Sequence, residues 1–375
     1  MTVVIAIDSF KGSLTSISAC ETAKKAVNEV FRDAKTIVIP IADGGEGTSF
    51  AYRFALGGRI EKATVTSPNF KKVTAEYTIL PDNTAVIEMA QASGLTLMKN
   101  KMNAGDTTSY GTGELIIDAI EKGSKKFIIG LGGSATNDGG VGALAALGIR
   151  FCRKDGNVIT PTGNGLSELN SIDIRNMNPK LNECSFTLAC DVENVICGPE
   201  GATYVYGKQK GAQEKDIKTL DHNLSLYADI VEKYTGRNIK NIKRGGAAGG
   251  LCAGLMGFLN AKAESGINLF LEIINFDSIV SVADFIISGE GKVDYQTAFG
   301  KVVCGIGEYA KKYNKPLFIV AGQLEDGYQA VFKKGITAAF STLHIINSYE
   351  YITKRADKDL FDTVKNICNI VNLKF

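Results

Sequence analysis

Residues 3–8 read Val-Val-Ile-Ala-Ile-Asp, an unbroken apolar run, mostly β-branched, that ends in a carboxylate. A run without a polar face predicts a strand that is buried on both sides, as in a parallel sheet. Apolar residues then recur at helical spacing, at positions 17, 20, 23, 27 and 31. A second strand at residues 36–39 and a helix that ends near residue 56 follow. This strand–helix–strand–helix opening favours a parallel sheet with right-handed crossovers.

The pattern changes near residue 61. Residues 61–90 alternate apolar and polar side chains, and turn signals stand at residues 67–69 and 81–83. This combination is typical of antiparallel, hairpin-like strands. We therefore place a domain boundary close to residue 60.

The last hundred residues return to the style of the opening. Short apolar strands are predicted at residues 284–288, 316–320 and 336–340. We predict an α/β fold of two different α/β domains around a cleft. One is a doubly wound, Rossmann-like parallel sheet built from a discontinuous domain, and the other is an inserted domain with a mixed sheet; their ranges are residues 1–60 plus 275–375, and residues 61–274.

The bulk composition excludes several classes of protein. The 375 residues carry a formal net charge of only +2, so nothing electrostatic favours a nucleic-acid partner. The first ten residues lack a basic region, and Asp8 interrupts what a signal peptide would need. The stretch 247–261 is too short and too rich in glycine to span a bilayer. We expect no nucleic-acid partner, no membrane anchor and no export.

Cysteine and histidine usage narrows the chemistry further. The eight cysteines form no CxxC pair and most stand in apolar surroundings, which favours buried free thiols in a reducing cytosol, hence a cytoplasmic protein. Of the two histidines, we expect His222 at the surface and His344 in packing. A Ser-His-Asp hydrolase is therefore disfavoured, and carboxylates and lysines are left for acid–base work.

Five loops after predicted strands are rich in glycine, and most also carry hydroxyl or carboxylate side chains. They are residues 8–13, 42–48, 130–140, 245–250 and 288–294. Ligands of open α/β sheets bind at the carboxyl ends of the strands, so these loops are expected to gather there. Glycine turns let backbone N–H groups approach an anion, and nearby carboxylates suit a divalent cation that neutralises phosphate. Phosphoryl transfer needs both.

The loop at residues 130–140 (GLGGSATNDGG) is the most informative. Its first six residues match the dinucleotide pattern G-x-G-x-x-A, which is a weak signal at mid-chain. The dense polar set that follows, Ser134, Thr136, Asn137 and Asp138, fits a phosphate- or substrate-binding turn before a helix at residues 139–147 better. The structural alternative is that Asn137 or Asp138 only caps this helix.

Neither common kinase signature is present in the sequence. Gly-Lys pairs occur at residues 207–208, 291–292 and 300–301, but none is followed by Ser or Thr as a P-loop requires. The HRD and DFG motifs of protein kinases are also missing. Any ATP site must therefore use another loop architecture.

The charged residues on the loops form a second pattern. Seven carboxylates stand at predicted strand ends, namely Asp8, Asp43, Glu46, Asp138, Asp191, Glu290 and Asp294. Each of these carboxylates alone could be an N-cap or turn residue, but together they would repel one another without a cation or a paired lysine. Four lysines are candidates for that pairing: Lys11, Lys210, Lys292 and Lys301. On local sequence alone, Lys210 is more readily read as an exposed lysine.

Together these loops resemble the bacterial glycerate kinase family, the type unrelated to protein kinases and P-loop kinases. The resemblance runs through essentially the whole chain in order. Its most specific parts are Ala42-Asp-Gly-Gly-Glu-Gly-Thr48 and Gly132-Gly-Ser-Ala-Thr-Asn-Asp-Gly-Gly140. Asp8-Ser-Phe-Lys11, Gln209-Lys-Gly-Ala212 and Gly289-Glu-Gly-Lys-Val-Asp294 support it.

The resemblance implies ATP-dependent phosphorylation of D-glycerate with Mg²⁺, in glyoxylate or sugar-acid breakdown, by two different α/β domains around a cleft. It favours 2-phosphoglycerate as the product, with 3-phosphoglycerate as the alternative. The expected partners are the small molecules D-glycerate and ATP, and the expected state is a monomer or a homodimer.

We predict the following roles for the loop residues. Mg²⁺ is held partly by Asp43, Glu46 or Asp191. Phosphate or substrate is bound by Asp8, Ser9, Gly132, Gly133, Ser134, Thr136, Asn137, Asp138, Lys210 and Glu290. Lys11 or Lys292 offsets transition-state charge, and Asp191 or Asp294 accepts the proton of the attacking hydroxyl.

Two rival functions remain open at this point. One is a nicotinamide-dependent oxidoreductase that uses the turn at Gly130. The other is a non-catalytic sugar-acid sensor, against which the intact loop carboxylates argue.

Overall fold

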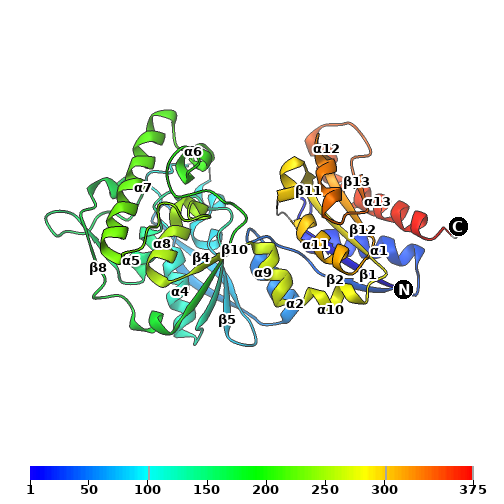
Figure 1. The fold of residues 1–375 in the computed structure, drawn as a ribbon, viewed down its shortest axis with the longest axis horizontal. Coiled ribbons are helices and arrows are strands. Elements are labelled where there is room, and N and C mark those ends of the chain that lie inside the picture. Colours follow the sequence, from blue (N-terminus) through cyan, green and yellow to red (C-terminus); the bar gives the residue numbers. More distant parts are fainter. Residues whose placement is uncertain (100–101, 300–301, 374–375) are drawn as a thin grey trace. The chain divides into compact units, whose positions relative to one another are not determined.

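The computed structural model describes residues 1–99, 102–299 and 302–373 (Figure 1). Its contacts divide the chain into two compact units. The first unit comprises Met1–Asp43 and Ile267–Phe375, and the second comprises Gly44–Gly266. The division predicted from the sequence comes after residue 60. The contact-based division comes earlier because helix α2 (Thr48–Leu56) packs against strands of the second unit.

The first unit is built on a five-stranded sheet in which every pairing is parallel. The strand order is β13-β12-β11-β1-β2. The strands are β1 (Thr2–Ile7), β2 (Lys35–Val38), β11 (Phe285–Val293), β12 (Leu317–Leu324) and β13 (Ala338–Ser341). From β1 the chain winds to one side and from β11 to the other, which confirms the predicted doubly wound sheet. The topological switch point lies between β1 and β11.

Helices cover both faces of this sheet. The side chains of residues 3–7 are therefore completely buried. Helices α1 and α13 lie against each other and pack on the sheet, while α11 packs on β11 and β12 (Figure 1). The helices are α1 (Ser16–Val30), α9 (Gly266–Ile273), α10 (Phe276–Ser281), α11 (Val302–Lys312), α12 (Tyr349–Lys354) and α13 (Ala356–Val371). The apolar run that opens the chain is therefore the centre of this core.

The second unit is built on a six-stranded mixed sheet in the order β10-β9-β6-β5-β4-β3. Its strands are β3 (Arg59–Thr66), β4 (Lys72–Ile79), β5 (Thr84–Glu88), β6 (Lys126–Gly130), β9 (Ser185–Ala189) and β10 (Lys262–Glu264). β3, β4 and β5 pair antiparallel, as the alternation over residues 61–90 predicts, and β5, β6, β9 and β10 pair parallel. The predicted mixed sheet is confirmed. A separate two-stranded ribbon joins β7 (Arg150–Cys152) to β8 (Ser171–Asp173).

Seven α-helices are described in this unit: α2, α3 (Ala90–Ser93), α4 (Tyr110–Glu121), α5 (Val141–Ala146), α6 (Ala202–Tyr206), α7 (Glu214–Thr235) and α8 (Leu251–Leu259). The apolar faces of α4, α5, α7 and α8 join the sheet in one large core. Within it the rings of Phe127 and Phe186, from neighbouring strands, stack with centroids 4.8 Å apart. This core fixes where β6 and β9 end, and therefore where their loops begin.

The structure also tests what the sequence predicts for the cysteines and for His222. All eight cysteines are free thiols, and all but Cys184 are buried, as predicted. His222 is exposed on α7, also as predicted. Among the helices of the described ranges, none is long and apolar enough to cross a membrane.

Candidate active site

In the first unit, the loop after β1 lies against β11 at the switch point. The Asp8 amide donates to the Gly289 carbonyl at 2.9 Å. A Cβ atom on Gly291 would lie only 3.3 Å from the backbone nitrogen of Lys11 and 3.4 Å from Phe10 Cα. Glycine at position 291 therefore lets the loop at residues 8–13 rest on β11. The predicted residues Asp8, Ser9, Lys11 and Glu290 come together at one end of this sheet.

Asp8 is the buried carboxyl of this group, with 8% of its surface exposed. Burial and then the neighbouring Asp43 raise its pKa to about 7, although the Ser9 amide donates to its Oδ1 at 2.6 Å. Two carboxyl groups thus share one environment in the first unit. Such a pair favours a shared proton or a cation.

Asp8→Asn is expected to remove a pH dependence of stability. The folded state binds the Asp8 proton more tightly than the unfolded state, since the pKa rises from 3.8 to about 7. That contribution is fully present below about pH 4 and is lost as the pH rises towards about 7. Relative to Asp8→Asn, the unaltered chain should lose on the order of a few kcal/mol of unfolding free energy across this window. Urea unfolding without added metal measures it, and parallel pH profiles for the two proteins would contradict it.

A lysine–carboxylate group follows at the end of β11. Lys292 Nζ lies 3.1 Å from Asp294 Oδ2 and 3.2 Å from Glu325 Oε2. The bonds to Asp294 and then Glu325 raise the pKa of Lys292, so it stays charged. Asp294 Oδ1 also accepts from the amide and the hydroxyl of Thr297, at 3.0 and 3.1 Å. Asp294 is therefore held in one orientation beside a cation.

In the second unit, the two most specific motifs of the sequence touch each other. The Gly132 amide donates to the Gly44 carbonyl at 3.1 Å. A Cβ on Gly132 would lie 2.5 Å from Gly45 Cα, so only glycine permits this approach. The loop after β6 and the loop before α2 therefore form one glycine-rich surface.

Glu88, at the end of β5, holds the loop before α2. It is buried, and its carboxylate accepts from the amides of Gly47 and Ser49 at 3.2 and 2.8 Å. Burial raises its pKa. Glu88 is not among the site residues predicted from the sequence, although a carboxylate inside an apolar strand is a signal that could have identified it. Glu46, in contrast, is exposed on the loop.

Asp138 is completely buried and organises the loop from inside. Its carboxylate accepts four hydrogen bonds, from the amide and hydroxyl of Ser109 and the amides of Gly140 and Gly142, at 2.7–3.2 Å. Burial raises its pKa. Asn137, also buried, donates to Thr203 Oγ1 at 2.9 Å. The N-cap residue of α5 is Gly140, so neither Asn137 nor Asp138 caps the helix itself, but the bonds from the Gly140 and Gly142 amides to Asp138 hold the chain where the helix starts.

The geometry of the same loop does not fit a dinucleotide-binding turn at residues 130–135. Helix α5 begins at Val141, well after the G-x-G-x-x-A match ends at Ala135. Gly139 and Gly140 precede it with φ of 65° and 80°, which break the chain direction. A dinucleotide turn would run straight into its helix.

Lys210 is the main surprise of the site. Only 3% of it is exposed, so the reading as an exposed lysine is wrong. Its ammonium donates to Ser134 Oγ at 2.7 Å and to the Thr136 carbonyl at 2.8 Å. Burial lowers its pKa to about 7, and the charge of Asp138 opposes this shift. Among the described residues, no carboxylate lies within ion-pairing distance of it.

Asp191 is the second residue after β9 in the second unit and is exposed. Its Oδ1 accepts from the Ser265 hydroxyl at 2.9 Å and from the Gly266 amide at 3.0 Å. The two predicted bases, Asp191 and Asp294, are thus carried by different units. Lys301 lies outside the described residues.

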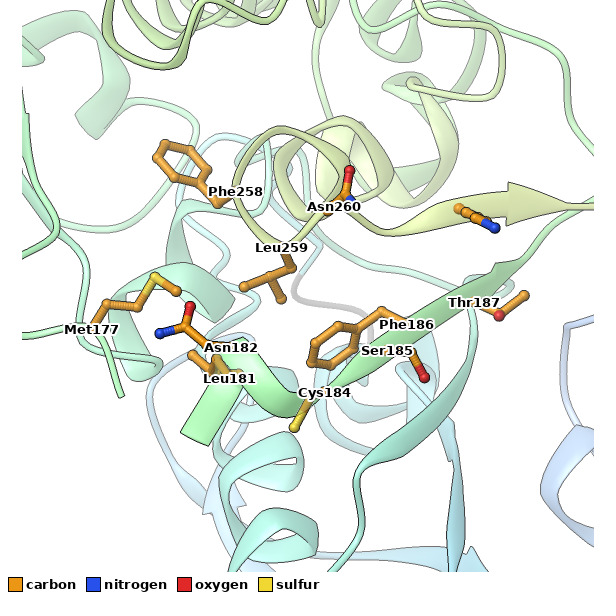
Figure 2. Close-up of a pocket in the computed structure, with 11 residues that line it drawn as sticks. Met177, Leu181, Asn182, Cys184, Ser185, Phe186, Thr187, Phe258, Leu259 and Asn260 are labelled. Carbon is orange, nitrogen blue, oxygen red and sulfur yellow. The ribbon is translucent and has the colours of Figure 1, made fainter. Parts of the chain in front are cut away.

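A cavity of about 400 Å³ lies elsewhere in the second unit (Figure 2). Its lining includes Ser185 and Phe186 at the start of β9, and Leu259 at the end of α8. It therefore lies at the amino ends of the parallel strands, whereas the loops of the candidate active site follow their carboxyl ends. It is not the candidate active site.

The fit to Mg²⁺ is partial. Over the described ranges, no cluster of three or more His, Cys, Asp or Glu could hold a metal by itself. Mg²⁺ in phosphoryl transfer commonly takes one or two carboxylates and completes its shell with phosphate and water oxygens. The Asp8–Asp43 pair meets that smaller requirement.

Each of the two sheets carries lysines, carboxylates and glycine-rich turns at the carboxyl ends of its strands, which are the groups that phosphoryl transfer requires. A family model described as the Glycerate kinase family matches residues 3–372. The chain belongs to the glycerate kinase family and is an enzyme of the kinase class.

Individual relatives match over nearly their whole length. The chain is 44% identical over 368 residues to a glycerate kinase of Halalkalibacterium halodurans, covering 98% of this chain and 97% of the relative. It is 43% identical over 369 residues to the glycerate 2-kinase of Escherichia coli K12, with the same coverage of 98% and 97%. The crystal structure of a proposed glycerate kinase 2 from Salmonella typhimurium LT2 has a TM-score of 0.86 at 39% identity, covering 99% of this chain and 98% of that one.

Proposed function

We propose that this enzyme transfers the γ-phosphoryl group of ATP to D-glycerate, with Mg²⁺, and forms 2-phosphoglycerate. The observation that carries the proposal is the full-length match to the glycerate kinase family. The 2-phosphate is favoured because a relative of 43% identity is named a glycerate 2-kinase. 3-Phosphoglycerate is the alternative product.

The second unit supplies the anion site in this proposal. Backbone N–H groups of Gly133 and Ser134 receive the carboxylate or a phosphate oxygen, and the Gly132 amide holds the loop through its bond to the Gly44 carbonyl. The buried ammonium of Lys210 has two neutral oxygens as its hydrogen-bond partners. A buried charge without a counter-charge is costly, so a bound anion would compensate it. Thr136, Asn137 and Asp138 act by positioning this loop.

The first unit supplies the groups for phosphoryl transfer. Lys11 and Lys292 offset negative charge on the transferring group, and Ser9 and Glu290 line the same strand ends. Asp43 with Asp8 would hold Mg²⁺ in this unit. Glu46 and Asp191, which the second unit carries, are the alternative candidate ligands. When bound, the cation supplies charge neutralisation on phosphate oxygens.

A carboxylate takes the proton of the attacking hydroxyl. As the hydroxyl oxygen of glycerate forms its bond to phosphorus, its proton moves to the carboxylate and ADP leaves with the bonding electron pair. We propose Asp294 for this role because Thr297 and Lys292 fix its orientation. Asp191 is the alternative base.

The direct test is ADP release by the purified chain. With ATP, Mg²⁺ and D-glycerate, one ADP should form for each glycerate consumed, and EDTA should abolish the reaction. Glycerate binding without ADP formation would instead support the sugar-acid sensor. A glycerate-dependent absorbance change of a nicotinamide would support the oxidoreductase.

We also propose that the enzyme works in the cytoplasm. Eight free thiols, most of them buried, suit a reducing compartment.

A further inference from the structure

The segment after β13 carries exposed apolar side chains at the carboxyl edge of the first unit's sheet. Leu343, Ile345 and Ile346 follow the strand, and Tyr349 opens α12. Ile346 is 97% exposed and Tyr349 70% exposed. Isolated exposed apolar residues are ordinary, but a group of them on one short segment marks a binding surface.

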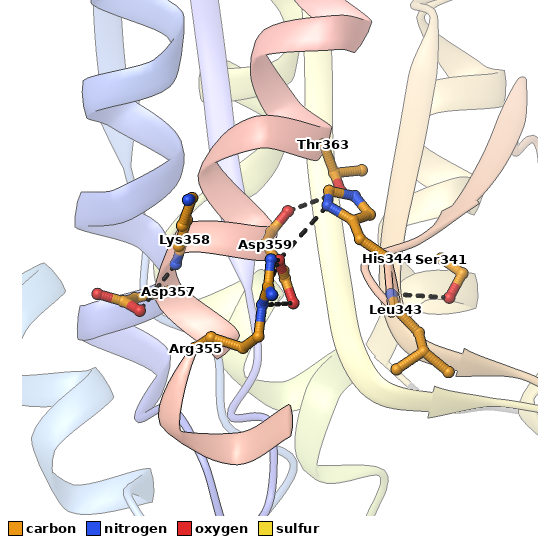
Figure 3. A network of polar contacts seen from close by, with 8 residues as sticks. All are labelled: Ser341, Leu343, His344, Arg355, Asp357, Lys358, Asp359 and Thr363. Carbon is orange, nitrogen blue, oxygen red and sulfur yellow. Dashed lines mark hydrogen bonds and ion pairs between the residues drawn. The ribbon is translucent and has the colours of Figure 1, made fainter. Parts of the chain in front are cut away.

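Polar contacts hold this segment in place (Figure 3). His344 Nε2 lies 2.9 Å from Thr363 Oγ1, and Nδ1 lies 3.4 Å from Asp359 Oδ1. Arg355 binds the same Asp359 carboxylate through Nε and Nη2. The neighbouring Leu343 points away from this network (Figure 3). The segment is therefore anchored to α13 at His344, directly between two of its exposed apolar residues, Leu343 and Ile345.

Tyr349 joins this segment to the loop that carries Lys11. Gly12 has a φ of +83°, and a Cβ there would lie 2.5 Å from the Tyr349 hydroxyl oxygen. The hydroxyl end of the ring thus rests on the Lys11–Gly12 turn, while most of the ring stays exposed. The exposed Tyr349 ring therefore lies next to the turn that carries Lys11, the lysine that the proposed function assigns to phosphate.

We propose that Leu343, Ile345, Ile346 and Tyr349 form the nucleobase-binding surface of the phosphoryl donor, with the purine against the Tyr349 ring. This inference rests on the proposed function, because it names the donor's subsite. A nucleotide needs an apolar surface for its base and cations for its phosphates, and here the two are adjacent. Purines stack on aromatic rings, and open α/β sheets bind nucleotides at this edge.

The test uses Tyr349→Ala and Ile346→Ser in the full-length enzyme. Each should weaken ADP binding, measured calorimetrically, and raise KM for ATP by about tenfold or more. kcat and KM for D-glycerate should change by less than about twofold, since neither residue touches the acceptor. Val282→Ser is the matched control: Val282 is 58% exposed but lies just before β11, at the amino edge of the same sheet, and should leave every parameter unchanged.

A second measurement separates base recognition from a general defect. The unaltered enzyme should prefer ATP to inorganic tripolyphosphate as the donor, and the two variants should lose most of that preference. If the unaltered enzyme forms no ADP, the proposed function fails, while ADP binding still tests the surface. If it is active and both variants bind ADP normally, the inference is wrong. A change in sedimentation with unchanged ADP affinity would make the surface an interface between two copies and would also overturn it.

Discussion

Asp294→Asn should lower turnover with ATP and D-glycerate by about 10²- to 10⁴-fold, the usual contribution of a positioned general base. The amide keeps the shape of the side chain and one acceptor for Thr297, so the fold and ADP binding should persist. Asp294 is 8% exposed and lies beside Lys292. In such a buried position, loss of the carboxylate's negative charge should strongly affect proton transfer. Steady-state kinetics and ADP calorimetry measure the two quantities.

Two further variants decide what the loss means. Thr297→Val removes both hydrogen bonds of the Thr297 hydroxyl with Asp294, one to its carboxylate and one from its amide. It should give a smaller loss, on the order of tenfold, because the base is present but less well oriented. Asp191→Asn tests the alternative base. If Asp294→Asn leaves turnover unchanged and Asp191→Asn abolishes it, Asp294 has no part in the mechanism.

Lys210→Met should lower kcat/KM for D-glycerate by about 10²-fold or more without lowering the stability of the fold by more than about 1 kcal/mol. Methionine fills a similar volume, and removing a buried ammonium relieves its desolvation cost. The loss of hydrogen bonds to Ser134 and Thr136 offsets this gain. A stable protein that has lost activity is the signature of a binding residue rather than of a structural one.

Lys208→Met is the matched control, because Lys208 is exposed and pairs with Glu214 on the same short segment. It should retain full activity. A proton balance adds a second readout: burial lowers the pKa of Lys210 to about 7, so anion binding at about pH 8 should draw a proton in the unaltered enzyme and not in Lys210→Met. An active but unstable Lys210→Met variant would assign this lysine to the fold alone.

The strands were predictable because the order of apolar and polar residues along each one indicates which of its faces are buried. The apolar run at residues 3–7 has no polar face, and it lies at the centre of a sheet covered on both sides. The alternation over residues 61–90 predicts the antiparallel part of the mixed sheet, which forms as β3, β4 and β5. In both cases the burial of each side chain can be inferred from residues that are close to it in the sequence.

The burial of Lys210 and the part played by Glu88 were not predictable in the same way. The stretch YGKQKGA is polar throughout, and only packing against the loop after β6 removes Lys210 from water. Glu88 stands in an apolar strand, but its partners, the amides of Gly47 and Ser49, are about 40 residues away along the chain. The local sequence marks Glu88 as an unusual residue for a buried strand, but it does not reveal hydrogen-bond partners that are distant along the chain.

Enolase alone can identify the product and so test whether this enzyme phosphorylates D-glycerate at the 2-hydroxyl. The purified chain is incubated with ATP, Mg²⁺ and D-glycerate, and enolase is added without phosphoglycerate mutase. The account predicts immediate formation of phosphoenolpyruvate, in step with ADP, because enolase acts on 2-phosphoglycerate. Phosphoenolpyruvate that appears only after mutase is added would mean that the 3-phosphate is formed, and ADP without any phosphoglycerate would contradict the proposed reaction altogether.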